Sequence, residues 1–260
     1  MKFSRFLISL FICLSFIPDF LNAQKIGEKV QKELMVDNQL IYKWVTVFGI
    51  EEFDEKGNVI HKKTENYEEW FKYDSRGNEI FHQANNKKTW TEYDSNGNKK
   101  RQKTNDKSES FWEYDKNNFL IYEKYISPDN PMSEAWYDNN SKGKPIHLKT
   151  NAGYEEWYTY DKNGNLIMEE SSTGYEAKSV YDKNNRLIQF YDSEGKNLVY
   201  EYDKNGRLIK SEFVDVTIVE YVYNDKGLLQ LQAVDDTIFL YDYEFYGDGT
   251  IRKKYTYHIF

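Results

Sequence analysis

An aromatic residue followed by aspartate or asparagine returns along the chain every 20 to 23 residues. A fixed period of this length is the mark of a repeat architecture, in which each unit is one supersecondary element that stacks on the next. A degenerate tenth copy is Phe245-Tyr246. The nine clear copies are Phe53-Asp54, Tyr73-Asp74, Tyr93-Asp94, Tyr114-Asp115, Tyr137-Asp138, Tyr160-Asp161, Tyr181-Asp182, Tyr202-Asp203 and Tyr223-Asn224. The sequence therefore predicts an array of similar units rather than one globular core.

The residues after each copy predict a hairpin turn. Aspartate favours a turn because its carboxylate can accept hydrogen bonds from the backbone amides that follow it. The fourth residue after the aromatic one is glycine or asparagine in nine of the ten copies, and these two residues enter the left-handed backbone region most readily. We infer a type I turn closed by a left-handed residue and a β-bulge. The turn glycines are Gly57, Gly77, Gly97, Gly164, Gly206 and Gly227.

The fifth copy departs from this rule. Ser141 holds the fourth place after the aromatic residue, and Gly143 follows two residues later. This spacing predicts a two-residue insertion in the turn.

The segments on either side of each turn have the composition of β-strands. Residues 70–73 and 198–202 precede a turn and are rich in aromatic and β-branched residues. A second, looser turn in each period, such as residues 172–174, completes a two-stranded unit. We expect an all-β fold, an elongated, curved or spiralling antiparallel meander of about 9–10 hairpin repeats of about 21 residues, rather than a sandwich.

Two regions depart from the repeat, which spans residues 51–260. Residues 24–50 precede the array as an N-terminal cap and first strand; we expect residues 26–35 to be a short helical or irregular cap and residues 40–48 to be a strand. Residues 127–145 stretch the period and contain Pro128, Pro131 and Pro145. Because proline cannot serve a central β-ladder, the sequence predicts a loop excursion there, as a hinge or a binding insertion.

The first 23 residues have the layout of a secretory signal peptide. Lys2 and Arg5 precede a largely apolar run at residues 6–17, and small residues end the segment at Ala23. We therefore expect an exported protein that is periplasmic, displayed at the cell surface or secreted. Cys13 is the only cysteine and lies in this segment, so the remainder has no disulfide and no thiolate metal ligand.

Charge and hydropathy narrow the range of partners. The formal net charge is -8 and no polybasic block is present, so nucleic acid is not an expected partner. No segment after the signal peptide is apolar enough to predict a transmembrane helix. The remaining partners are an unknown protein or a glycan.

One stretch carries a family resemblance. Residues 181–188 have the sequence Tyr-Asp-Lys-Asn-Asn-Arg-Leu-Ile, and residues 202–209 repeat it as Tyr-Asp-Lys-Asn-Gly-Arg-Leu-Ile. This unit resembles the bacterial YD repeat, also called the RHS repeat, and the resemblance extends over residues 53 to about 250. It implies a β-repeat architecture exposed at a cell surface and no catalytic residue. In large family members such repeats form a shell around a C-terminal toxin domain; this chain ends at Phe260 without a distinct domain, so we do not expect that role here.

No catalytic or metal-binding constellation stands out. The turn at residues 161–165 resembles a calcium loop, but its glycine is fourth rather than sixth and no glutamate is placed at twelve. Glu155 and Glu156 are strand neighbours and should point to opposite faces. The histidines are His61, His82, His147 and His258, and their spacing fits no metal site. We expect no enzyme activity and no cofactor; a secreted hydrolase is the third and weakest interpretation.

The aromatic residues are the remaining candidates for function. Alternation places Trp70, Trp90 and Trp157 on the strand face opposite the repeated tyrosines, and Trp136 is a fourth candidate. Exposed tryptophans can anchor a protein partner or stack on sugar rings. The competing interpretation is that these aromatic residues are the core. We predict an exported scaffold for binding or protein interaction, with a carbohydrate-binding module that uses the tryptophans as the alternative.

Overall fold

The computed structural model describes residues 25–36 and 39–259. The predicted signal peptide lies outside the described residues. The regular secondary structure of these residues consists of 21 β-strands. The chain divides into two compact units: unit 1 comprises the residues up to Tyr67 and from Val222 onward, and unit 2 comprises Glu68–Tyr221.

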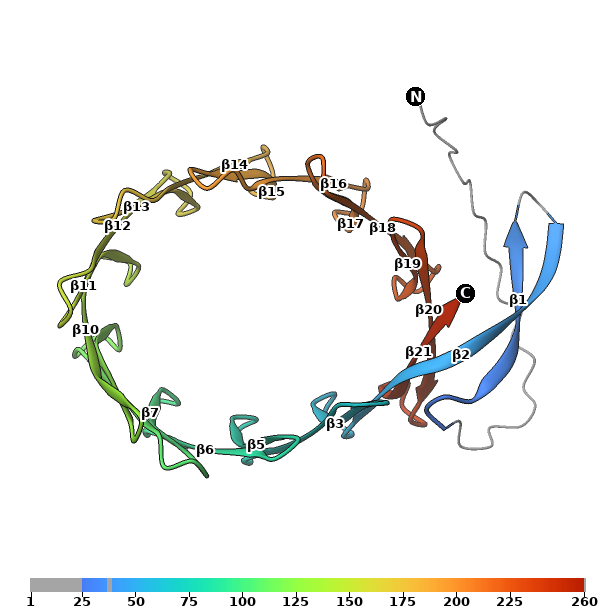
Figure 1. Ribbon diagram of the computed structural model, residues 1–260, viewed down its shortest axis with the longest axis horizontal. Coiled ribbons are helices and arrows are strands. Elements are labelled where there is room, and N and C mark those ends of the chain that lie inside the picture. Colours follow the sequence, from blue (N-terminus) through green and yellow to red (C-terminus); the bar gives the residue numbers. More distant parts are fainter. Residues whose placement is uncertain (1–24, 37–38, 260) are drawn as a thin grey trace. The chain divides into compact units, whose positions relative to one another are not determined.

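Unit 2 is an antiparallel meander. Figure 1 shows its strands following one another in a single curved layer, and each strand pairs with the next. The predicted meander of hairpins is confirmed. The strands are β4 (Glu68–Tyr73), β5 (Glu79–Ala84), β6 (Lys87–Tyr93), β7 (Lys99–Thr104), β8 (Glu109–Tyr114), β9 (Leu120–Ser127), β10 (Asn130–Asn139), β11 (Pro145–Thr150), β12 (Glu155–Tyr160), β13 (Leu166–Ser171), β14 (Glu176–Tyr181), β15 (Leu187–Asp192), β16 (Asn197–Tyr202), β17 (Leu208–Phe213) and β18 (Thr217–Tyr223), the last of which runs on into unit 1.

The turn motif works through both oxygens of its aspartate. Asp161 Oδ1 accepts the backbone N–H groups of Asn163 at 2.9 Å and Asn165 at 2.8 Å, and Oδ2 accepts the Asn165 side-chain amide at 2.9 Å. Gly164 closes the turn at φ +87°. In the next repeat Arg186 Nε donates to Asp182 Oδ2 at 2.7 Å, so arginine replaces asparagine in the same role. The side-chain bond explains why asparagine and arginine recur at the end of the motif.

Tyrosines at the strand ends link several repeats to the one before, through a hydroxyl that donates to a backbone carbonyl. The hydroxyl of Tyr160 donates to the carbonyl of Pro145 at 2.8 Å, and the hydroxyl of Tyr202 donates to that of Leu187 at 2.8 Å. Each acceptor is the first strand residue after the previous turn, where the ladder carries a bulge. A net hydrogen bond of this kind contributes about 0.5–1.5 kcal/mol, which a phenylalanine cannot supply.

The turn of the fifth repeat has no insertion, so the predicted two-residue insertion is wrong. Asn140 Oδ1 accepts the backbone N–H groups of Lys142 at 2.9 Å and Lys144 at 3.1 Å, so this turn has the same length as the others. The register pairs Asn139 with Pro145 at the bulge, as it pairs the tyrosine in other repeats. The residue that ends the strand is therefore Asn139, not Tyr137. The Tyr-Asp dipeptide at 137–138 resembles the motif but lies two residues too early.

The extra residues of this repeat lie in its strands. β9 and β10 are longer than most strands of the unit and pair with each other, so the predicted loop excursion at residues 127–145 is wrong. Proline is tolerated because of where it falls. Pro131 lies in an irregular part of the ladder between Asn130 and Ser133, and Pro145 is the first residue of its strand, opposite the bulge.

Unit 1 contains the two ends of the array. Residues 29–36 form a strand, where the sequence predicted a helical or irregular cap. The hydrophobic core of unit 1 consists of Val45, Val47, Leu231, Leu240, Tyr255 and Tyr257. Its complete strands are β1 (Lys29–Val36), β2 (Gln39–Phe53), β3 (Val59–Thr64), β19 (Leu229–Val234), β20 (Thr237–Phe245) and β21 (Ile251–Ile259).

The ends of the array pair with each other, which corrects the predicted elongated, curved or spiralling form of the meander. β2 runs antiparallel to β21 from Thr46 opposite His258 to Glu52 opposite Lys253 (Figure 1). An ion pair joins Lys254 Nζ to Glu51 at 2.7 Å across this junction. The pairing satisfies backbone groups that a free edge would leave exposed. The repeat period is a local signal and does not specify this distant partner.

Candidate functional site

The four candidate tryptophans occupy the same place in their repeats. Trp70, Trp90, Trp136 and Trp157 each stand three residues before the residue that ends the strand, on β4, β6, β10 and β12. Their exposed fractions are 44%, 43%, 44% and 42%. We call these four residues the tryptophan row. Their exposure favours a surface role over the core interpretation.

Aromatic rings of neighbouring strands pack against Trp90, Trp136 and Trp157. Trp90 lies 5.8 Å from Phe81 and Trp136 lies 5.7 Å from Tyr122, measured between ring centroids. Trp157 stacks on His147 at 5.5 Å with an interplanar angle of 16°. These contacts restrict each indole while much of its surface remains exposed. A partially held ring loses less conformational entropy when a partner covers it.

Charged groups lie between Trp136 and Trp157. On β11, Lys149 stands opposite Trp136 and His147 stands opposite Trp157. His147 bonds Asp138 through Nδ1 at 3.1 Å and Glu155 through Nε2 at 3.0 Å. The bond to Asp138, followed by that to Glu155, raises the pKa of His147 above its usual value. This part of the row therefore combines apolar rings with a charged network that the sequence spacing did not reveal.

The opposite face of β12 and β13 carries carboxylates among tyrosines. Glu156 accepts hydrogen bonds from the hydroxyls of Tyr154 and Tyr158. Glu155 instead reaches His147 among the tryptophans, so the two neighbouring glutamates point to opposite faces, as alternation predicted. Burial, and then the charge of Glu156, raises the pKa of Glu169. This face is acidic and partly desolvated.

The raised pKa of Glu169 gives a prediction with a defined sign. A carboxylic acid whose pKa is higher in the folded state makes folding less favourable when it ionises. The free energy of unfolding therefore falls as the pH rises from 4.5, the usual pKa of glutamate, through the higher pKa of the folded state. Glu169→Gln should therefore stabilise the protein near pH 7, and the gain should vanish in acid, where Glu169 is neutral. Denaturant titrations over a pH series measure both quantities. An equal effect of the substitution in acid and near pH 7 would contradict the desolvation account.

Asp161→Asn provides the contrasting control. The backbone hydrogen bond from Asn165 is the largest influence that lowers the pKa of Asp161 below its usual 3.8. Its contribution to stability is present above pH 3.8 and is lost as the pH falls through the lower folded value. The two substitutions should therefore change stability near pH 7 in opposite directions.

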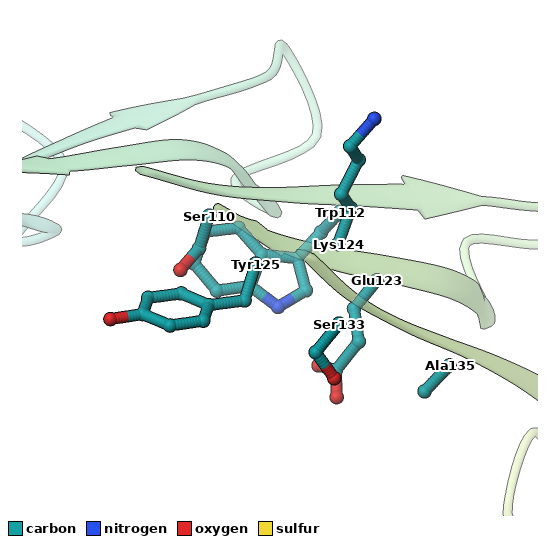
Figure 2. Close-up of a pocket in the computed structure, with 7 residues that line it drawn as sticks. All are labelled: Ser110, Trp112, Glu123, Lys124, Tyr125, Ser133 and Ala135. Carbon is teal, nitrogen blue, oxygen red and sulfur yellow. The ribbon is translucent and has the colours of Figure 1, made fainter. Parts of the chain in front are cut away.

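A small hollow lies on the tyrosine-bearing side of β8 to β10. Its volume is about 190 Å³, and Ser110, Ser133 and Ala135 leave it open between larger side chains. Figure 2 shows the indole of Trp112 and the ring of Tyr125 beside it, with Glu123 close to Ser133. Glu123 already accepts the hydroxyl of Tyr137 at 2.7 Å. The hollow is smaller than typical ligand pockets of about 300–1,000 Å³.

Across residues 25–36 and 39–259, no three His, Cys, Asp or Glu side chains are placed to hold a metal ion. Within the same residues there is no helix with the length and apolar character needed to cross a membrane.

Comparison with known proteins identifies a related family. The teneurin YD-shell family model matches residues 125–258. Among solved structures, a Tc holotoxin pore from Photorhabdus luminescens is similar at 12% identity and a TM-score of 0.38, over 84% of this chain and 14% of that one. The TcdB2-TccC3 complex is similar at 12% identity and a TM-score of 0.37, over 82% of this chain and 14% of that one. This chain thus spans about 14% of the length of those toxin chains.

A protein of another kind is also similar in structure over most of this chain. A porin-like protein from Bacteroides uniformis is similar at 9% identity and a TM-score of 0.42, over 82% of this chain and 96% of that one. No curated protein matches the sequence.

Proposed function

The chain belongs to the teneurin YD-shell family, and from that premise we propose that it is an exported repeat scaffold that binds a protein partner through the tryptophan row. Export is inferred from the signal-peptide layout of residues 1–23. The proposed place of action is the bacterial envelope or the outside of the cell. The proposed role is non-catalytic and needs no cofactor.

The observation that carries the proposal is the repeated exposure of one residue type at one repeat position. Four indoles at 42–44% exposure present a large apolar area to solvent on a chain whose overall composition is polar. Tryptophan is enriched among residues that dominate binding energy at protein interfaces. A scaffold built from repeats offers such residues at regular intervals along an extended surface.

A glycan is the second candidate, and the surroundings of Trp157 favour it. His147, Lys149 and Glu155 place hydrogen-bonding groups beside the exposed indole. Flat aromatic rings flanked by such groups can stack on a sugar and bond its hydroxyls. In this case Trp136 and Trp157 would contribute more to binding than Trp70 and Trp90.

The test compares the full chain with a variant in which all four tryptophans of the row are replaced by alanine. Pull-downs from envelope and host extracts and a glycan array should show retention that the variant loses. Its melting temperature should change little, because exposed side chains contribute little to stability. Tyr191→Ala, at 40% exposure outside the row, is the matched control and should retain binding.

Two results would refute the proposal. If the unmodified chain retains no partner in the pull-downs and no glycan on the array, the binding role is refuted. A collapse of the melting temperature in the fourfold variant would show that the tryptophans are part of the core.

A further inference from the structure

The fifth repeat lacks the tyrosine that its neighbours place between successive turns. Asn139 stands where Tyr160 and Tyr202 stand in their own repeats, opposite the bulge. An open cavity of about 510 Å³ lies at this point, and its lining includes Phe119, Ile121 and Asn139. We call this cavity the tyrosine gap.

The neighbouring repeats show what fills the equivalent space. In the following repeat the Tyr160 hydroxyl donates to the carbonyl of Pro145, the first residue after the previous turn, at 2.8 Å. A side chain from the end of that turn covers the ring: the Lys144 ammonium lies 5.3 Å from the Tyr160 centroid. Arg186 covers Tyr202 in the same way at 4.8 Å. The space between two turns is therefore shaped for a phenol ring.

The gap retains the parts that hold such a ring but lacks the ring itself. Phe119 occupies the turn position of Lys144 and Arg186, and its ring extends over Gly143 of the next turn. Asn139 Nδ2 donates to the carbonyl of Leu120 at 2.7 Å, which replaces the missing tyrosine bond. That carbonyl has a second lone pair and can accept another donor. Ile121, 38% exposed, adds an apolar wall accessible from solvent.

We propose that the tyrosine gap binds the phenol ring of a tyrosine side chain on a partner protein. The incoming ring packs against Phe119 and Ile121, and its hydroxyl donates to the carbonyl of Leu120. The partner thus supplies the side chain that the repeat itself provides elsewhere. The site shares no residue with the tryptophan row, so this proposal can be tested independently of the proposed function.

N-acetyltyrosinamide is the probe, titrated into the full chain and followed by ligand-observed NMR. Saturable binding with a dissociation constant on the order of 1 mM is expected for a ligand of this size. N-acetylphenylalaninamide should bind about fivefold more weakly because it lacks the hydroxyl. Asn139→Tyr should abolish binding, because the repeat's own ring then fills the gap.

Two further variants keep the test decisive. The first variant combines Asn139→Tyr with Phe119→Asn, which restores the regular repeat at both positions. It removes any crowding between the two rings. This double variant should also lose binding. Asn163→Tyr adds the same side chain to an exposed place in a neighbouring turn and should leave binding intact. The proposal is overturned if the unmodified chain shows no saturable binding or if Asn139→Tyr in the restored background binds as well as the unmodified chain.

Discussion

Replacing Tyr257 by alanine should lower the free energy of unfolding of unit 1 by about 3–5 kcal/mol. Tyr257 is 1% exposed and is the largest fully buried side chain among the described residues. It stands opposite Val47 on β2 and Leu240 on β20, so it packs where the first and last parts of the array meet. The Lys32 ammonium lies 4.4 Å from its ring centroid. Truncation would leave a cavity and remove this cation–π contact together.

Chemical denaturation followed by circular dichroism measures this loss. Tyr257→Phe keeps the ring in the core and should cost much less than the alanine substitution. Tyr191→Ala truncates an exposed tyrosine and should fall within about 0.5 kcal/mol of the unmodified chain. A cost below about 1 kcal/mol for Tyr257→Ala would contradict a packed junction between β2 and β21.

The repeat unit was predictable because its interactions are local. Asp161 bonds residues two and four places ahead of it, and Gly164 adopts the left-handed conformation within the same turn. Such contacts leave a signature in consecutive residues that needs no knowledge of distant partners. The side-chain alternation of each strand follows from the same local geometry, which is why the opposite orientations of Glu155 and Glu156 could be anticipated.

The features that sequence reasoning missed depend on register or on distant partners. At residues 137–139 the Tyr-Asp dipeptide carries the motif, yet the ladder places Asn139 at the strand end, and only the pairing with Pro145 reveals this. The pairing of β2 with β21 joins residues about two hundred positions apart. The exposure of Trp157 could not be deduced from alternation, because alternation assigns a face and not what covers that face.

Gly143→Ala should destabilise unit 2 by about 2–4 kcal/mol, which combines backbone strain with overpacking. Gly143 has φ +79°, a conformation that is unfavourable for any residue with a Cβ atom. An added Cβ would lie 2.4 Å from two ring atoms of Phe119, so the ring would also have to move. Denaturant unfolding of the full chain gives the size of the loss.

Gly97 separates the two contributions because it has the strain without the collision. Its φ is +88°, and nothing lies within 4 Å of an added Cβ. Gly97→Ala should therefore cost about 1–2 kcal/mol from strain alone. In a Phe119→Ala background the ring is gone, so Gly143→Ala should fall to the cost of Gly97→Ala. An unchanged cost in that background would show that Phe119 does not restrict the turn, and the tyrosine gap would then lack the ring that is proposed to cover it.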